Sequence, residues 1–172
     1  MRVHLFASFL AIWAAGVAKG IDPCLDPQQT YYYQCVQGAT EIKLTKDDCG
    51  GDFTDSNLTD VVSCFDNTGR TSVTTMWLQS SDITALPAGL FDGFDNLDYL
   101  FIFDSPLTSM PLGLFNGLHS LSYLWVTGTQ LASLPAGLFD GLDDLNQLSL
   151  YDNHLASLPT GLFDGLYAMH SV

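Results

Sequence analysis

A chain of 172 residues, 47% of them hydrophobic, has the length of one domain and enough apolar content for a core. Its formal net charge at pH 7 is −14, since 19 Asp and Glu residues stand against 5 Lys and Arg, and no Lys or Arg follows Arg70. Such a surface repels phosphate groups, which argues against nucleic acid and anionic membrane surfaces as partners.

Residues 1–20 have the pattern of a secretory signal peptide. Arg2 supplies a positive charge, an apolar run of roughly 13 residues follows, and small residues favour cleavage after Ala18 or Gly20. A membrane-spanning helix needs about 20 apolar residues, so this run is too short to be an anchor. We expect a secreted, extracellular product with no membrane span in this chain.

All four cysteines fall between this leader and the repeats described below: Cys24, Cys35, Cys49 and Cys64. An even number of cysteines in an exported chain predicts two disulfide bonds, with three connectivities open. A zinc site usually requires C-x-x-C pairs, which are absent here, and no metal site is expected. Asn57-Leu58-Thr59 satisfies the rule for N-glycosylation and predicts a glycan on Asn57.

From Val73 onward one pattern recurs every 24 residues. Leu86-Pro87 and its three later copies are each followed by a near copy of Gly-Leu-Phe-Asp-Gly-Leu. Two aliphatic positions in each unit are separated by one residue, as in a strand with one buried face, so each unit is expected to form a short strand and a return loop. The twenty aliphatic positions expected inside are Val73, Met76, Leu78, Ile83, Leu86, Leu97, Leu100, Ile102, Leu107, Met110, Leu121, Leu124, Val126, Leu131, Leu134, Leu145, Leu148, Leu150, Leu155 and Leu158.

This spacing resembles the extracellular leucine-rich repeat family, and the Leu-Pro-x-Gly-Leu-Phe-Asp-Gly-Leu half is most similar to variable lymphocyte receptors, Slit proteins and Toll-like receptor ectodomains. The resemblance implies a leucine-rich repeat solenoid, with short parallel β-strands on the concave face and loops or short helices on the convex side. It also implies that residues 21–72 form a disulfide-stapled N-terminal cap. Residues 73–172 would then hold four units of 24 residues and the start of a fifth, apparently truncated.

Three further features of the repeats lead to predictions. Phe91, Phe115, Phe139 and Phe163 should stack as a spine on the convex side. The glycines two residues after each Phe should adopt positive φ in tight turns. At the position where the family carries a buried Asn, only Asn153 supplies the amide, and Ser81, Ser105 and Thr129 offer hydroxyls that form fewer hydrogen bonds.

The 24-residue step places Met169 and Val172 at the first inward positions of a fifth strand, and no cysteine-rich cap follows them. An uncovered edge strand at this end would be open to self-association.

The residues between the inward aliphatic positions should point out of the concave face. Seven of them are aromatic: Trp77, Tyr99, Phe101, Phe103, Tyr123, Trp125 and Tyr151. Cross-strand aromatic ladders can simply stabilise a sheet. An exposed wall of large rings is, however, typical of a binding surface. Asp98, Asp104 and Asp152 border this wall and suit a partner with a basic rim.

We therefore interpret the chain as a secreted recognition module for a protein or peptide ligand, without cofactors. Alternatives are an extracellular carbohydrate-binding or matrix/adhesion protein and a fragment of a cell-surface receptor ectodomain. An enzyme is not expected, because His119, His154 and His170 lie apart and no nucleophile motif or phosphate loop accompanies them.

Overall fold

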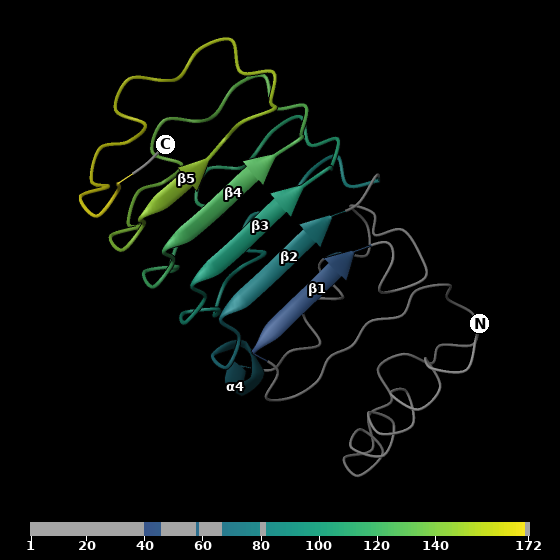
Figure 1. The fold of residues 1–172 in the computed structure, drawn as a ribbon, viewed down its shortest axis with the longest axis vertical. Coiled ribbons are helices and arrows are strands. Elements are labelled where there is room, and N and C mark those ends of the chain that lie inside the picture. Colours follow the sequence, from purple (N-terminus) through teal and green to yellow (C-terminus); the bar gives the residue numbers. More distant parts are fainter. Residues whose placement is uncertain (1–39, 46–57, 59–66, 80–81, 171–172) are drawn as a thin grey trace.

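The computed structural model describes residues 40–45, 58, 67–79 and 82–170 (Figure 1). The expected signal peptide, the four cysteines, Asn57 and Ser81 lie outside these residues. The elements are β1 (Glu41–Thr45), α4 (Asn67–Arg70), β2 (Thr75–Gln79), β3 (Tyr99–Phe103), β4 (Tyr123–Thr127) and β5 (Gln147–Ser149). No helix in the described part is long and apolar enough to cross a membrane.

The five strands form one parallel sheet in the order of the sequence, β1-β2-β3-β4-β5 (Figure 1). Met76 pairs with Leu100 and Leu100 with Leu124, so each repeat adds one strand in the same register. A parallel connection needs a long return, and the rest of each 24-residue unit supplies it. The predicted parallel-strand solenoid is confirmed.

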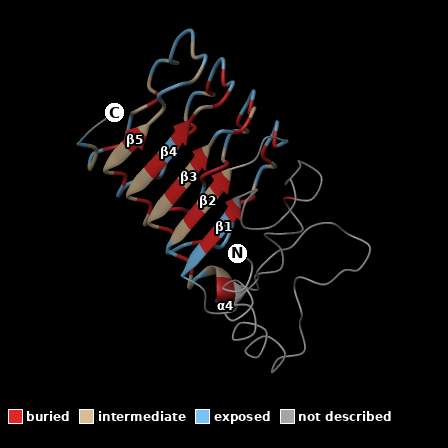
Figure 2. Ribbon diagram, turned by 45° about the vertical axis from the view of Figure 1, so that its right-hand side comes forward, coloured by how far each residue is buried: buried red, intermediate tan, exposed pale blue. Residues whose placement is uncertain are grey.

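The core lies between the sheet and the return loops. All fifteen predicted inward positions in the first three units are buried, and so are Leu145 and Leu148 in the fourth (Figure 2). Leu150 and Leu155 are only partly buried, and Leu158 is 46% exposed. The prediction was wrong for Leu158, because no later turn of the described chain packs over this last unit.

The return loops consist of turns rather than helices in the described residues. Each begins with a hydrogen bond from the amide of the inner Leu to the proline carbonyl three residues earlier, as from Leu90 N to Pro87 O at 3.3 Å. Glycine is required two residues after each spine Phe, where φ is +82° at Gly93 and stays within a few degrees of this value in later copies. The convex side is therefore a stack of identical turns.

The predicted spine of phenylalanines is present. Neighbouring rings from Phe91 to Phe163 lie 6.1, 6.1 and 6.4 Å apart between centroids, with interplanar angles of at most 17°. Phe91, Phe115 and Phe139 are buried, and Phe163 in the last unit is partly buried. Offset stacking at this separation is favourable for aromatic rings.

The Asn153 amide links two turns, as the family resemblance implies. Its Nδ2 donates to the carbonyls of Val126 (2.8 Å) and Leu150 (2.7 Å), and its Oδ1 accepts from the Thr129 hydroxyl. Ser105, one repeat before Thr129, donates to the Phe103 carbonyl of its own turn. Asn153 therefore joins the last two repeats by side-chain hydrogen bonds.

The strand β1 lies inside the segment expected to be the cap and was not predicted. Ile42 and Leu44 are buried beside Met76 and Leu78 of β2, and the amides of Thr74 and Thr75 both donate to the Thr40 carbonyl. The signal was present as the alternation Glu-Ile-Lys-Leu-Thr, although it does not follow the 24-residue step. One strand from residues 21–72 thus covers the edge of β2.

Candidate functional site

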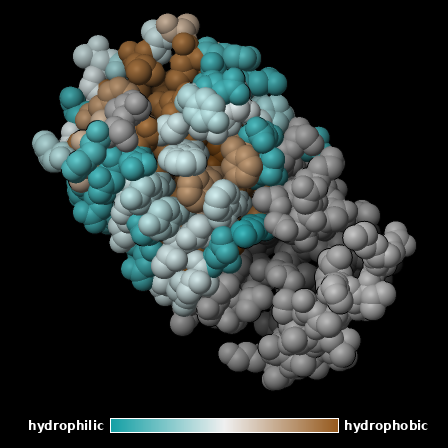
Figure 3. Space-filling model, viewed as in Figure 1, coloured by the Kyte–Doolittle hydropathy of each residue, from teal (hydrophilic) through white to brown (hydrophobic). Residues whose placement is uncertain are grey.

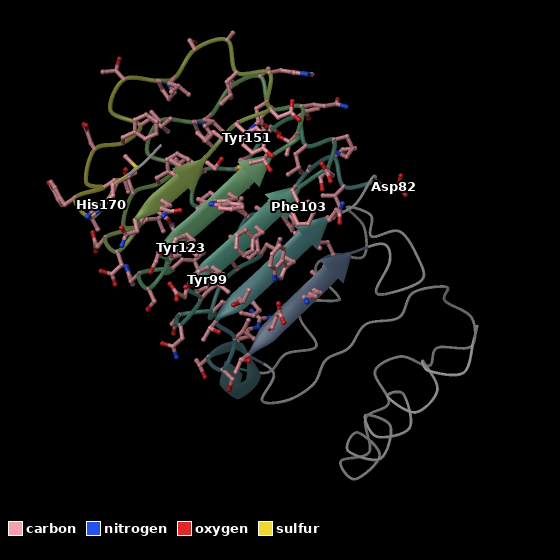
Figure 4. All side chains as sticks on the ribbon, viewed as in Figure 1. Asp82, Tyr99, Phe103, Tyr123, Tyr151 and His170 are labelled. Carbon is pink, nitrogen blue, oxygen red and sulfur yellow. The ribbon has the colours of Figure 1, made fainter. Side chains whose placement is uncertain are left out.

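The outward residues of β2, β3 and β4 bring six rings to one face of the sheet. In β2 and β3 buried and partly exposed residues alternate strictly, because successive side chains of a strand point to opposite faces. Figure 4 shows the labelled Tyr99, Tyr123 and Phe103 among the side chains that project from this face. We call the following set the concave aromatic surface: Trp77, Tyr99, Phe101, Phe103, Tyr123 and Trp125.

The rings contact one another across the strands. Trp77 stacks on Phe101 at 4.1 Å between centroids, and Tyr99 stacks on Tyr123 at 4.7 Å. Trp125 meets Phe101 edge to face, at 5.2 Å and 79°. Trp77, Phe101 and Trp125 therefore form a continuous column across β2, β3 and β4, in which the last ring is turned across the others.

Exposure differs among these residues. Trp125 is 43% exposed, whereas the other five rings are partly buried against their neighbours. Thr127, also expected to point outward, is buried next to Phe103 in the register. Tyr151 is 70% exposed and follows β5 after one residue, without a ring contact in the described part of the chain. Trp125 is thus the most accessible ring of the surface, and Tyr151 lies at its margin.

Figure 3 shows this face with pale and tan aromatic side chains in the middle and hydrophilic residues, in teal, around them. Brown, hydrophobic side chains gather separately towards the C-terminal end of the solenoid.

Two residues of β1 join the surface and were missed by sequence reasoning. Glu41 and Lys43 alternate with the buried Ile42 and Leu44, and Lys43 pairs in register with Trp77. Glu41 Oε1 accepts a hydrogen bond from Trp77 Nε1 at 2.9 Å and lies 3.4 Å from Lys43 Nζ. The edge strand therefore brings one positive charge, that of Lys43, to the border of the surface.

The strands end in a turn with positive φ. Asp104 has φ of 50° and Asp152 has φ of 55°, while the equivalent position between them is Gly128, with φ of 63°. Asp tolerates this conformation better than most residues. Asp104 Oδ2 accepts a hydrogen bond from Gln79 Nε2 at 2.9 Å, so the carboxylate is held at the C-terminal ends of β2 and β3.

The surroundings of Tyr99 disfavour ionisation of its hydroxyl. The Asp98 carboxylate raises the pKa of the neighbouring Tyr99 hydroxyl, and burial and Tyr123 raise it further. The hydroxyls of Tyr99 and Tyr123 and the indole N–H of Trp125 have no hydrogen-bond partner among the described residues. These three groups are available to water or to a ligand.

No cluster of metal ligands or catalytic groups occurs in the residues that the structure describes. No group of three His, Cys, Asp or Glu could hold a metal ion there. His119 and His170 contact the backbone carbonyls of Gly141 and Ala168, far apart in the sequence.

Residues 71–131 match the family model described as "Leucine rich repeat". The fold is also similar to a chain in the structure of the Toll–Spatzle complex of Drosophila, with a TM-score of 0.56 and 23% identity over 63% of this chain and 14% of that chain. It is similar to a chain in the TLR13–ssRNA13 complex, with a TM-score of 0.57 and 18% identity over 77% of this chain and 22% of that chain. No curated protein matches the sequence. These likenesses show the fold, and the chain spans under a quarter of the length of either structure.

Proposed function

We propose that this chain, a leucine-rich repeat solenoid similar in fold to Toll-like receptor ectodomains, is a secreted recognition module that binds a protein or peptide through its concave aromatic surface. The observation that carries the proposal is the set of six outward rings on three adjacent strands. Trp and Tyr are the residues that most often dominate binding energy, and an apolar patch of this kind usually has a partner.

A role in stabilising the sheet explains the placement of only some of these rings. Trp77 and Phe101, stacked at 4.1 Å, support each other as a ladder would. Trp125 contributes an edge contact and leaves 43% of its surface to solvent, with its indole N–H unpaired among the described residues. A ring placed in this way stabilises the fold little and offers both an apolar face and a hydrogen-bond donor.

The charge distribution favours a polypeptide partner over nucleic acid. One neighbour in fold was solved in complex with RNA. In this chain no Lys or Arg occurs between Thr71 and Val172, so β2 to β5 have no cation to pair with phosphates. Lys43, on β1, is engaged by Glu41.

Selection from a phage-displayed peptide library tests the function. Peptides selected on the wild-type chain should bind Phe101→Ala/Trp125→Ala at least about tenfold more weakly, since hot-spot truncations cost about 2 kcal/mol or more. Leu112→Ala is the matched control, because Leu112 is 64% exposed in a return loop and lies outside the surface. Equal affinity of the double variant and the wild type, with both folded by circular dichroism, would refute the proposed site.

A carbohydrate ligand is the second candidate, favoured by the accessible Trp125 ring, because sugars also stack on aromatic faces. A glycan array run beside the peptide selection separates the two. Binding of glycans, lost in Trp125→Ala, together with no peptide enrichment would replace the first proposal with the second. A matrix or adhesion function would be compatible with either peptide binding or glycan binding.

The secreted location, the disulfides Cys24, Cys35, Cys49 and Cys64, and the glycan on Asn57 are also proposals. Expression in animal cells should release a product whose first residue is Lys19 or Ile21. Its mass should fall by four hydrogens relative to the reduced chain and rise by one glycan. A product retained in the cell with residues 1–20 attached would contradict the proposed export. Sequencing the 3′ end of the transcript tests whether the chain is a piece of a longer receptor ectodomain.

A further inference from the structure

We propose that a shallow hollow beside the concave aromatic surface receives a basic side chain, Lys or Arg, of the bound polypeptide. The hollow lies at the C-terminal ends of β3 and β4 and is lined by Asp104, Ser105, Pro106, Gly128 and Gln130. It opens to solvent, and Asp104 is its one ionisable residue. This inference rests on the proposed function, because it concerns the same ligand.

The space exists because Gly128 stands where the repeats before and after it carry Asp. Asp104, Gly128 and Asp152 occupy the same place in three successive repeats, all with positive φ. A Cβ at position 128 would lie 2.8 Å from Asp104 Oδ1, so the carboxylate would have to turn away from its present position. The glycine therefore leaves room for the Asp104 carboxylate to lie over the next turn.

The negative charge of the Asp104 carboxylate is not paired with a positive charge among the described residues. Its Oδ2 accepts from the neutral Gln79 amide at 2.9 Å, and no Lys, Arg or His among the described residues comes within ion-pair distance of Asp104. The Asp104 amide donates to the Thr127 carbonyl at 3.2 Å, which fixes the backbone that carries the charge. A cation from another molecule is the natural complement of a fixed carboxylate.

The position links this charge to the aromatic surface. Asp104 directly follows Phe103, whose ring meets Trp77 edge to face at 6.0 Å. A peptide lying across the rings would pass the ends of these strands, so an apolar residue on the rings and a basic residue in the hollow can belong to one short segment. No Lys or Arg occurs from Thr71 onward, so a cation from the partner would meet no competing basic residue of β2 to β5 at this carboxylate.

Asp104→Asn is the variant for the test, because Asn keeps an acceptor for Gln79 and tolerates positive φ. Asp143→Asn is the matched control, since it removes one exposed acid from the return segment before β5. Peptide libraries are selected in parallel on the wild-type chain and on both variants. One wild-type peptide is then made with each basic residue replaced by its neutral analogue, such as citrulline for arginine.

Wild-type and Asp143→Asn selections should enrich a Lys or Arg at a constant distance from an aromatic or apolar residue, and Asp104→Asn should lose the basic preference. Replacing that Arg by citrulline should weaken binding to the wild type about fivefold, the upper range for an exposed ion pair, and weaken binding to Asp104→Asn less than twofold. Apolar peptides enriched without a basic residue, or equal losses in wild type and Asp104→Asn, would overturn this inference and leave the proposed function standing. No enrichment on the wild-type chain would overturn both.

Discussion

Truncation of the central spine residue, Phe115→Ala, should remove a large part of the stability of the fold. Phe115 is 1% exposed, and its ring lies 6.1 Å from both Phe91 and Phe139. Removal of a buried ring loses its transfer free energy and leaves a cavity, at a cost of about 3–5 kcal/mol. A domain of this size is usually stable by about 5–15 kcal/mol, so about a fifth or more of the total would be lost.

Urea denaturation followed by circular dichroism measures this loss as a change in midpoint at constant slope. Phe163→Ala is the matched comparison, because Phe163 is only partly buried and stacks on one neighbour, Phe139. It should cost about 1–2 kcal/mol. Phe115→Leu keeps most of the side-chain volume, so it should lower the free energy of unfolding by less than Phe115→Ala does. If Phe115→Ala cost less than about 1 kcal/mol, or no more than Phe163→Ala, the stacked spine would not be a main support of the core.

Three other variants test separate contacts. Asn153→Ser should lower the free energy of unfolding by about 1–2 kcal/mol, because one hydroxyl cannot replace both Nδ2 bonds, including that to the Val126 carbonyl of the previous turn; an unchanged urea midpoint would contradict the cross-turn role. Asp98→Asn should lower the raised pKa of the Tyr99 hydroxyl towards its ordinary value. The folded chain holds this proton more tightly than the unfolded chain, so the stability it contributes is present below the ordinary tyrosine pKa of about 10 and is lost as the pH rises through the folded value. Titration of phenolate absorbance checks the pKa, and urea denaturation across the same pH range checks the stability; an identical absorbance titration of the variant would refute the assignment to Asp98. Leu158→Asp should reduce any concentration-dependent association in sedimentation velocity, since Leu158 is 46% exposed in the last described turn; association that persists in the variant would place the contact elsewhere.

The repeated part of the fold could be predicted from the sequence almost residue by residue. A constant step of 24 residues fixes the register of a parallel stack, so the outward residues of β2, such as Trp77, follow from the buried Met76 and Leu78 beside them. The spine followed for the same reason, because equivalent positions must lie above one another.

The predictions failed for the parts of the chain that lie outside the 24-residue step or at its last described unit. β1 pairs with β2 but is not separated from it by the 24-residue step, and only its local alternation marks it. Leu158 repeats the inward pattern, yet burial needs a following turn, which the described residues do not include.

The details of the candidate site depend on side-chain packing that spacing does not encode. The edge-to-face orientation of Trp125 and the contact of Glu41 with Trp77 arise between residues on neighbouring strands. The hollow beside Asp104 arises because one repeat carries Gly where its neighbours carry Asp. A comparison of the repeats at this position could have indicated the space, but not the direction of the carboxylate.

Oxidative footprinting of the chain, alone and saturated with a library-selected peptide, tests the central claim most directly. Met76 is fully buried although its thioether is readily oxidised, and Trp125 is 43% exposed. Trp125 should be oxidised rapidly in the free chain and slowly in the bound one, while Met76 is spared in both. If Met76 reacted as fast as Trp125, or if saturating peptide left the Trp125 rate unchanged, the outward rings would not be the contact surface.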